Sequence, residues 1–251
     1  MAIVAAVLVL RPAGSAEARR EAPSGPLVVL DPGHGGTNTG APGLDSVYEK
    51  TVTLQLARQI KQRLEAKGVR VRLTRDRDTY LTLRQRVAFA NQVRADLMVS
   101  IHFNASPAHS QRGFETYLLT PEALDVDARA LRASDGPTRY GLDNTTSRLV
   151  DDVERGLAMP RAARLASTIQ AALGRVRGSS PNRGVRQDSM HVLLGANMPA
   201  VLVEVGFIDH PVEGRQLLQA ETQATIADAL GDAIAAAAGD LVGSPDATPR
   251  W

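Results

Sequence analysis

Residues 27–36 have the sequence Leu27-Val28-Val29-Leu30-Asp31-Pro32-Gly33-His34-Gly35-Gly36. The four apolar residues at its start predict a short buried strand. Pro32 and the glycines end this strand and form a tight loop in which the backbone can approach a ligand closely. His34 lies in the loop, just past the strand, where open α/β sheets usually carry their functional sites. A structural histidine in a glycine turn is the alternative, so the interpretation of His34 depends on the rest of the chain.

Composition limits the classes of protein to consider. The chain has 251 residues, of which 43% are hydrophobic, and this is enough for the core of one large domain. The formal net charge is only +2 and aromatic residues make up 4%, so the sequence gives no indication of nucleic-acid binding. The absence of cysteine excludes disulfides and thiolate metal sites. Any metal ion must therefore be held by histidine, aspartate or glutamate.

The two ends of the chain differ in composition from its middle. An apolar run from Ala2 to Leu10 is too short to span a bilayer as a helix, and small residues of the kind found at signal-peptide cleavage sites follow it. We therefore expect residues 1–25 to be a signal or processing segment, with export to the periplasm or the medium and no transmembrane anchor. A frayed N-terminus of a cytoplasmic protein is the alternative, because the usual basic segment is missing. Residues 241–251 are expected to form a disordered tail.

Between these ends, strand and helix patterns alternate. Helical periodicity follows Glu49 up to Gly68, and a helix is predicted at 83–93. Strands are predicted at 69–73, where valine and arginine alternate, at 96–101, which is nearly all apolar, and at 112–119, where apolar and polar residues alternate. This order predicts a single α/β domain over residues 26–240, with a twisted, mainly parallel sheet of about six strands flanked by helices. In such a sheet the carboxyl ends of the strands lie along one edge.

Two histidines and a glutamate are candidates for a site at this edge. His34 and His102 each follow an apolar strand, and Glu49 lies in the first turn of the helix after His34. Two histidines and one carboxylate, with a fourth position left open, are a usual ligand set of catalytic zinc. The separations are too long for a local metal motif, and Glu49 could equally be a favourable partner of the helix dipole.

A second informative stretch surrounds Glu204, which lies within the apolar run 199–207. A carboxylate in such a run costs free energy unless it is paired, protonated or bound to a metal. Glu204 is therefore a functional candidate in its own right. The alternative is an ion pair with a buried arginine such as Arg183 or Arg186.

Residues 121–158 form a polar, acidic insertion in which hydrophobic periodicity fades. A connection of this length is either a functional lid or a disordered excursion. One short helix is expected at 149–157, and regular structure resumes with a helix at 162–173 and a long helix at 214–238.

Six segments occur in an order that resembles a known family. They are Leu30-Asp31-Pro32-Gly33-His34-Gly35-Gly36, Glu49-Lys50, Leu83-x-x-Arg86 through Ala90-Asn91, Ser100-Ile101-His102-Phe103-Asn104-Ala105, Arg112-Gly113-Phe114-Glu115 and Leu202-Val203-Glu204-Val205-Gly206-Phe207-Ile208. Together they resemble the zinc-dependent N-acetylmuramoyl-L-alanine amidases of the division-amidase catalytic-domain type (Amidase_3). The resemblance runs from about Leu27 to Gly239.

The resemblance implies a function and roles for four residues. It implies one zinc ion per chain, held by His34, Glu49 and His102, with Glu204 as the catalytic residue. The implied substrate is peptidoglycan, cleaved between N-acetylmuramic acid and L-alanine of the stem peptide during wall remodelling and daughter-cell separation. A catalytically silent peptidoglycan-binding module of the same fold and a zinc peptidase with other substrates are the alternatives.

Further residues are weaker candidates. Asp31 could support a zinc-binding histidine or could cap the glycine loop. Asn104 could bind substrate, and His191, ahead of an expected strand, could face the site or serve only in packing. The insertion lies where related amidases can carry a helix over the active site. Carboxylates of Asp151, Asp152 or Glu154 could then block the metal's open position until a partner protein removes them.

Overall fold

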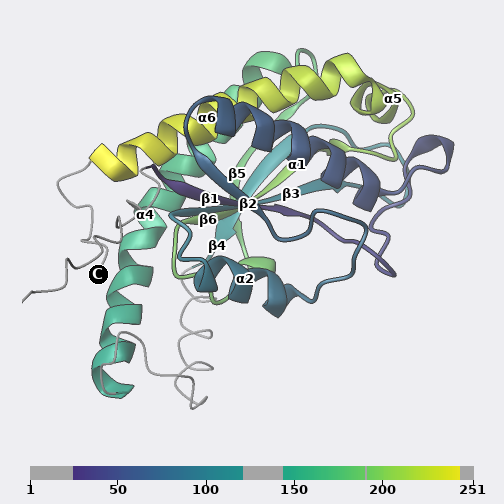
Figure 1. Cartoon of the computed structure of the whole chain (residues 1–251). Coiled ribbons are helices and arrows are strands. Elements are labelled where there is room, and N and C mark those ends of the chain that lie inside the picture. Colours follow the sequence, from purple (N-terminus) through teal and green to yellow (C-terminus); the bar gives the residue numbers. More distant parts are fainter. Residues whose placement is uncertain (1–24, 121–143, 190, 244–251) are drawn as a thin grey trace, which may run out of the picture.

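The computed structural model describes residues 25–120, 144–189 and 191–243 and shows a central sheet with helices on both faces (Figure 1). Six strands form one sheet in the order β2-β1-β3-β6-β4-β5. Their bounds are β1 (Leu27–Pro32), β2 (Arg70–Leu73), β3 (Leu97–Asn104), β4 (Phe114–Leu119), β5 (Asn182–Asp188) and β6 (Ala200–Phe207). The α-helices are α1 (Glu49–Ala66), α2 (Leu83–Gln92), α4 (Asn144–Val176), α5 (Glu213–Leu218) and α6 (Ala220–Gly243), with short 3-10 helices η1 (Leu44–Ser46) and η2 (His191–Leu193).

The sheet is mixed but mainly parallel, which confirms the predicted fold class. Strands β2, β1, β3 and β6 pair with one another in parallel. Strand β4 runs antiparallel to β6, and β5 runs parallel to β4. The carboxyl ends of β1, β3 and β6 therefore share one edge of the sheet with the amino ends of β4 and β5. We call this edge the site edge.

Burial along the strands follows their place in the sheet. Every residue of β1 is buried, as expected for an apolar strand that has parallel neighbours on both sides and helices above and below. Strand β5 lies at the end of the strand order and is largely exposed, and its charged and polar residues suit an edge strand.

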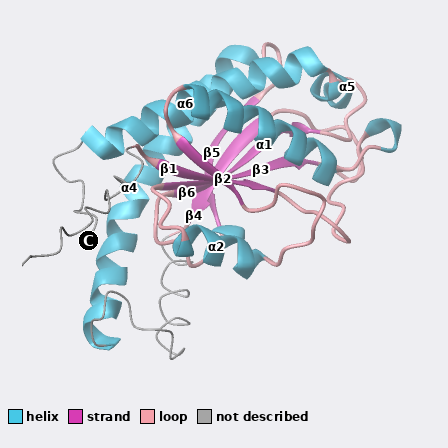
Figure 2. Cartoon of the chain, viewed as in Figure 1, coloured by secondary structure: helices cyan, strands magenta, loops and turns pink. Residues whose placement is uncertain are grey.

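The helices pack on the two faces of the sheet (Figure 2). Two apolar cores lie between the helices and the sheet. On one face, α1, α6 and the second half of α4 cover a core that includes Val28 and Leu30. On the other face, α2 and η2 cover a smaller core that includes Val29 and Met98. Because successive strand residues point to opposite faces, adjacent residues of β1 contribute to different cores.

Several predicted boundaries were wrong. The helices expected at 149–157 and 162–173 are one helix, α4, which continues through Pro160. Proline removes a backbone hydrogen bond inside a helix. The turns that follow it bury Leu165 and Ile169, so packing offsets the loss. Conversely, the helix expected at 214–238 is divided into α5 and α6 by the extended backbone at Gln219.

Candidate metal centre

His34 is held in a constrained loop at the end of β1. Its φ of 60° lies in the left-handed region that non-glycine residues rarely adopt. Arg86 of α2 donates hydrogen bonds to the carbonyl oxygens of Pro32 (2.8 Å) and His34 (2.6 Å), and Arg75 donates to those of Pro32 and Gly33. The two buried arginines therefore fix the backbone that carries the imidazole, at a site where strain of this kind is often functional.

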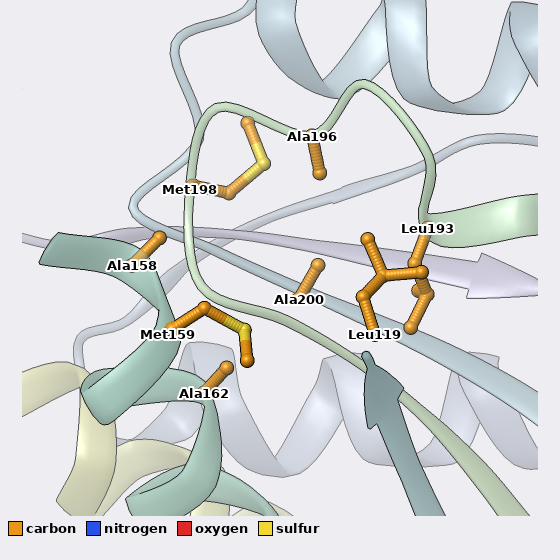
Figure 3. Close-up of a pocket in the computed structure, with 8 residues that line it drawn as sticks. All are labelled: Leu119, Ala158, Met159, Ala162, Leu193, Ala196, Met198 and Ala200. Atoms are coloured by element: carbon orange, nitrogen blue, oxygen red, sulfur yellow. The ribbon is translucent and has the colours of Figure 1, made fainter. Parts of the chain in front are cut away.

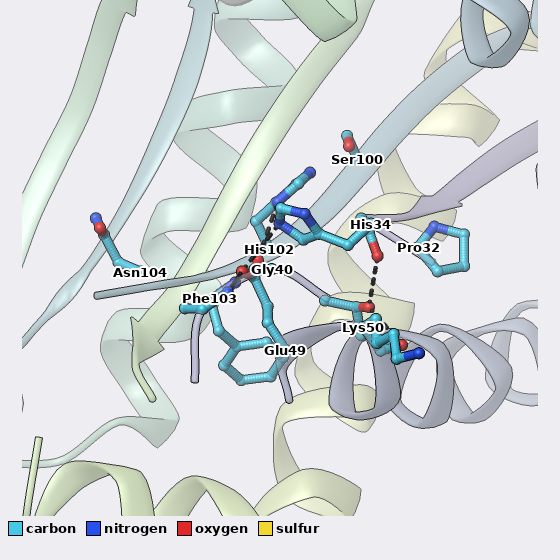
Figure 4. A network of polar contacts seen from close by, with 12 residues as sticks. Pro32, His34, Gly40, Glu49, Lys50, Ser100, His102, Phe103 and Asn104 are labelled. Carbon is cyan, nitrogen blue, oxygen red and sulfur yellow. Dashed lines mark hydrogen bonds and ion pairs between the residues drawn. The ribbon is translucent and has the colours of Figure 1, made fainter. Parts of the chain in front are cut away.

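Glu49 brings the two histidines together. As the first residue of α1, it places its Oε2 2.9 Å from His34 Nε2 and its Oε1 3.0 Å from Nδ1 of His102 on β3 (Figure 4). The same carboxylate accepts hydrogen bonds from the backbone N–H groups of Ala41 and Phe103, each at 2.9 Å. Its position and orientation are thus fixed by the loop before α1 and by β3.

Two glycines leave the room that these side chains occupy. A Cβ on Gly33 would lie 2.3 Å from the His102 ring. A Cβ on Gly40, which has a φ of +68°, would lie 2.6 Å from both Glu49 Oε2 and His34 Cδ2. Any larger residue at either position would displace a candidate ligand.

The three side chains form a group suited to a metal ion. One ligand atom from each of His34, Glu49 and His102 lies within 4.8 Å of the others. His102 Nε2 is buried and has no hydrogen-bond partner among the described residues, which is unfavourable unless another group binds it. Oxygen and imidazole nitrogen donors of this kind suit zinc. Beside them lies an open pocket lined by His34, Asn38, Tyr80, Leu81, Leu83, Arg86, His102 and Val192.

The charge of Glu49 dominates the electrostatics of this group. Burial disfavours charge on Glu49, but hydrogen bonds from His102 and His34 outweigh it and hold its pKa well below the ordinary value. Burial likewise opposes protonation of His34, yet the neighbouring Glu49 carboxylate raises the pKa of the imidazole. The carboxylate therefore stays ionised and gives the group the negative charge that attracts a cation.

Glu204 lies beside the group on the next strand. The register of β3 with β6 pairs His102 directly with Glu204. Burial raises the pKa of Glu204 well above its ordinary value, and the charges of Glu49 and Glu115 raise it further. Its Oε2 is buried without a hydrogen-bond partner in the described parts of the chain. The expected alternative, an ion pair with Arg183 or Arg186, is not found among the described residues, where both arginines pair with Glu115.

Comparison with known proteins shows the family. The family profile described as N-acetylmuramoyl-L-alanine amidase matches residues 28–236, which is most of the chain. This chain belongs to the N-acetylmuramoyl-L-alanine amidase family. It is 32% identical over 212 residues to the amidase AmiC of Escherichia coli O6:H1, covering 81% of this chain and 51% of that protein. It is 31% identical over 216 residues to AmiA of Escherichia coli K12, covering 83% of this chain and 74% of that protein.

Solved structures of amidases share the fold. The amidase AmiC2 of Nostoc punctiforme is 30% identical, with a TM-score of 0.63 over 83% of this chain and 94% of that one. An N-acetylmuramoyl-L-alanine amidase of Clostridium difficile 630 is 27% identical, with a TM-score of 0.66 over 88% and 98% of the two chains. The chain spans about half the length of the AmiC relatives that it matches.

The weaker candidates of this amidase-family chain lie as follows. Among the described residues, Asp31 makes no direct hydrogen bond to either histidine or to a backbone N–H of the glycine loop, so both expected roles stay predictions. It accepts hydrogen bonds from Arg86, Thr74 and Ser100, and it acts on the loop only through Arg86. Asn104 is the last residue of β3 and donates a hydrogen bond to Glu115 Oε1 at 2.8 Å, and its role in binding substrate stays a prediction. His191 begins η2 instead of preceding a strand, and its side chain lies outside the described residues.

The direction of β4 bears on the predicted lid. Because β4 runs antiparallel to β6, it ends at Leu119 on the edge of the sheet opposite to the site edge. An apolar pocket lies there, between Leu119, Ala200 and the α4 residue Met159 (Figure 3). The insertion therefore leaves the sheet at the edge opposite to His34, Glu49 and His102. This geometry gives no support to a block of the proposed metal site by Asp151, Asp152 or Glu154. Residues 121–143 and the side chains of these three acids lie outside the described residues.

Sequence reasoning missed three supporting residues. Arg86 stood in a recognised segment but had no assigned role, although its buried contacts with the His34 loop are extensive. Asn38, whose Oδ1 lies 2.9 Å from His34 Nδ1, was hidden in a glycine-rich loop without periodicity. Glu115 lies between Phe114 and Thr116 on β4, and only the structure shows that its side chain is 1% exposed.

Proposed function

We propose that this chain is a zinc-dependent N-acetylmuramoyl-L-alanine amidase that cleaves the amide bond between N-acetylmuramic acid and L-alanine in peptidoglycan. One observation carries the proposal. The ligand atoms of His34, Glu49 and His102 lie together beside Glu204, whose Oε2 is buried and has no hydrogen-bond partner among the described residues. Membership of the amidase family supports the substrate class.

The residues divide into ligands and a base. His34, Glu49 and His102 would hold one zinc ion, which when bound polarises the amide carbonyl and makes a water molecule easier to deprotonate. Glu204 would take a proton from the attacking water as the new carbon–oxygen bond forms. It would then deliver that proton to the L-alanine nitrogen as the carbon–nitrogen bond breaks. The raised pKa of Glu204 brings this carboxylate toward the range in which both transfers are efficient.

The proposed setting is the cell wall, in the periplasm or outside the cell, with a role in wall remodelling. In the parts of the chain that the structure describes, no helix combines the length and hydropathy needed to cross a bilayer. The predicted signal segment, residues 1–25, lies almost entirely outside those parts. Action of a partner protein on residues 121–158 stays a prediction.

Two variants test the proposal against the silent binding module. The parent protein should contain about one zinc per chain and release stem peptides from purified sacculi, detected by mass spectrometry. Glu204→Gln should keep the zinc and lose hydrolysis, because the amide preserves the shape but accepts no proton. His102→Ala should lose both. Full zinc occupancy in His102→Ala would contradict the ligand assignment, and near-normal hydrolysis by Glu204→Gln would remove Glu204 from the chemistry.

A further inference from the structure

A row of polar side chains crosses the sheet at the site edge and continues beyond Glu204. The strand registers pair His102 of β3 with Glu204 of β6, and Glu204 with Glu115 of β4. Glu115 in turn contacts Arg183 and Arg186 of β5. Since neighbouring strands lie about 4.8 Å apart, the two arginines fall roughly 5 to 10 Å from Glu204.

Glu115 anchors both arginines through one atom. Its Oε2 lies 3.0 Å from Arg183 Nε and 2.8 Å from Arg186 Nε, and its Oε1 accepts a hydrogen bond from Asn104. The carboxylate is only 1% exposed, whereas the arginine side chains are 27% and 47% exposed. The guanidinium group of Arg183 also lies over the Phe207 ring, 5.2 Å from its centroid. Two partly exposed cations are thus held in place by one buried anion.

This arrangement leaves binding capacity on the arginines. Each guanidinium carries five N–H donors, and the contacts with Glu115 are made by Nε. Within the described residues, no hydrogen bond or ion pair is found for the terminal Nη nitrogens of either arginine. One carboxylate beside two guanidinium groups also leaves an excess of one positive charge. Paired, pre-oriented guanidinium groups of this kind favour a second carboxylate, which they can bind through parallel hydrogen bonds.

We infer that Arg183 and Arg186, anchored by Glu115, form a subsite for a carboxylate group on the peptide side of the substrate. The inference rests on the proposed function for the identity of the substrate, but the carboxylate selectivity follows from the arginines alone. An extended peptide advances about 3.5 Å per residue. A carboxylate borne one or two residues beyond the scissile bond at Glu204 would therefore reach the arginines. The subsite would fix the direction of the stem peptide and favour acidic over amidated peptides.

The test compares a carboxylate with its amide. The probes are the dipeptide L-alanyl-D-glutamate and its diamide, with binding measured by calorimetry or NMR titration. N-acetylmuramoyl-L-alanyl-D-glutamate and its diamide serve as substrates for kcat/KM. The protein variants are Arg186→Gln, Arg186→Lys and, as a control for lost charge, Arg72→Gln, whose exposed side chain lies on β2 at the other end of the strand order.

The parent protein and Arg72→Gln should bind the acid about 10-fold more tightly than the diamide, as charged hydrogen bonds allow. Arg186→Gln should lose most of this preference without weaker binding of the diamide, and Arg186→Lys should recover part of it. The subsite is refuted if the parent protein does not distinguish the probes, or if Arg186→Gln weakens both equally. A parent protein that hydrolyses neither substrate but retains the binding preference would refute the proposed function and leave the subsite standing.

Discussion

Replacing Arg86 by methionine should destabilise the protein severely, because Arg86 pairs with a buried carboxylate. Its Nη1 lies 2.7 Å from Asp31 Oδ1, and the two side chains are 3% and 0% exposed. Arg86→Met keeps much of the apolar volume but leaves a buried anion without its cation and the carbonyl oxygen of His34 without the Arg86 donor, whereas Pro32 keeps its hydrogen bond from Arg75. Breaking one side of a buried ion pair costs about 3–5 kcal/mol of unfolding free energy. For a domain of this size, the melting temperature should fall by roughly 10 °C.

The assay is equilibrium unfolding in urea, with Arg84→Met as the matched control. Arg84 lies two residues earlier in α2 and is exposed, so its replacement should change stability by no more than about 0.5 kcal/mol. The double variant Asp31→Asn/Arg86→Met removes the uncompensated charge and should be more stable than the sum of the single losses predicts. A loss below about 1 kcal/mol in Arg86→Met, or strict additivity in the double variant, would refute the reasoning.

Three further predictions concern the site and the insertion. Gly40→Ala should lose zinc, measured by metal analysis, because the added Cβ would meet Glu49 Oε2. The control Gly68→Ala adds its Cβ in open space and should keep the zinc. Equal zinc contents in the two variants would contradict the role of Gly40. In metal-free protein, burial keeps Glu204 protonated after the unfolded chain has released its proton, so stability falls as pH rises above about 4.3. Glu204→Gln should remove this fall, so the difference in unfolding free energy between the variant and the parent protein should grow between pH 4 and 7. A difference that stays constant over this range would contradict the prediction. Replacing residues 121–143 by a Gly/Ser linker should leave the rate of sacculus hydrolysis unchanged, because β4 ends at the edge opposite to the site edge. A several-fold faster rate would support the predicted lid.

The sequence predicts what local patterns control. The apolar run before Pro32 predicts β1, and the following glycines predict a loop at its end, because both effects act within a few residues. Helical periodicity after Glu49 correctly places this residue at the start of α1. The parallel order of the sheet then suffices to bring His34 and His102 to the same edge.

Other features depend on partners that are distant in sequence. Alternation along β4 predicts a strand but not its direction, so the opposite placement of Leu119 could not be foreseen. An arginine in an amphipathic helix is normally exposed, and only the buried Asp31 explains why Arg86 is not. The continuity of α4 through Pro160 likewise depends on packing against the sheet and α6.

Because β4 runs antiparallel to β6, changes in loop length are expected to have different consequences at the two edges of the sheet. At the site edge, the loop after β1 carries His34 and leads to Glu49, so a change in its length would move two of the proposed ligands. The connection from β4 toward α4 starts at the other edge, where no ligand or base proposed above is found. That connection can lengthen, shorten or acquire a tether to another protein while the chemistry stays constant. It is accordingly the place at which to graft a reporter or an anchoring module onto this amidase domain.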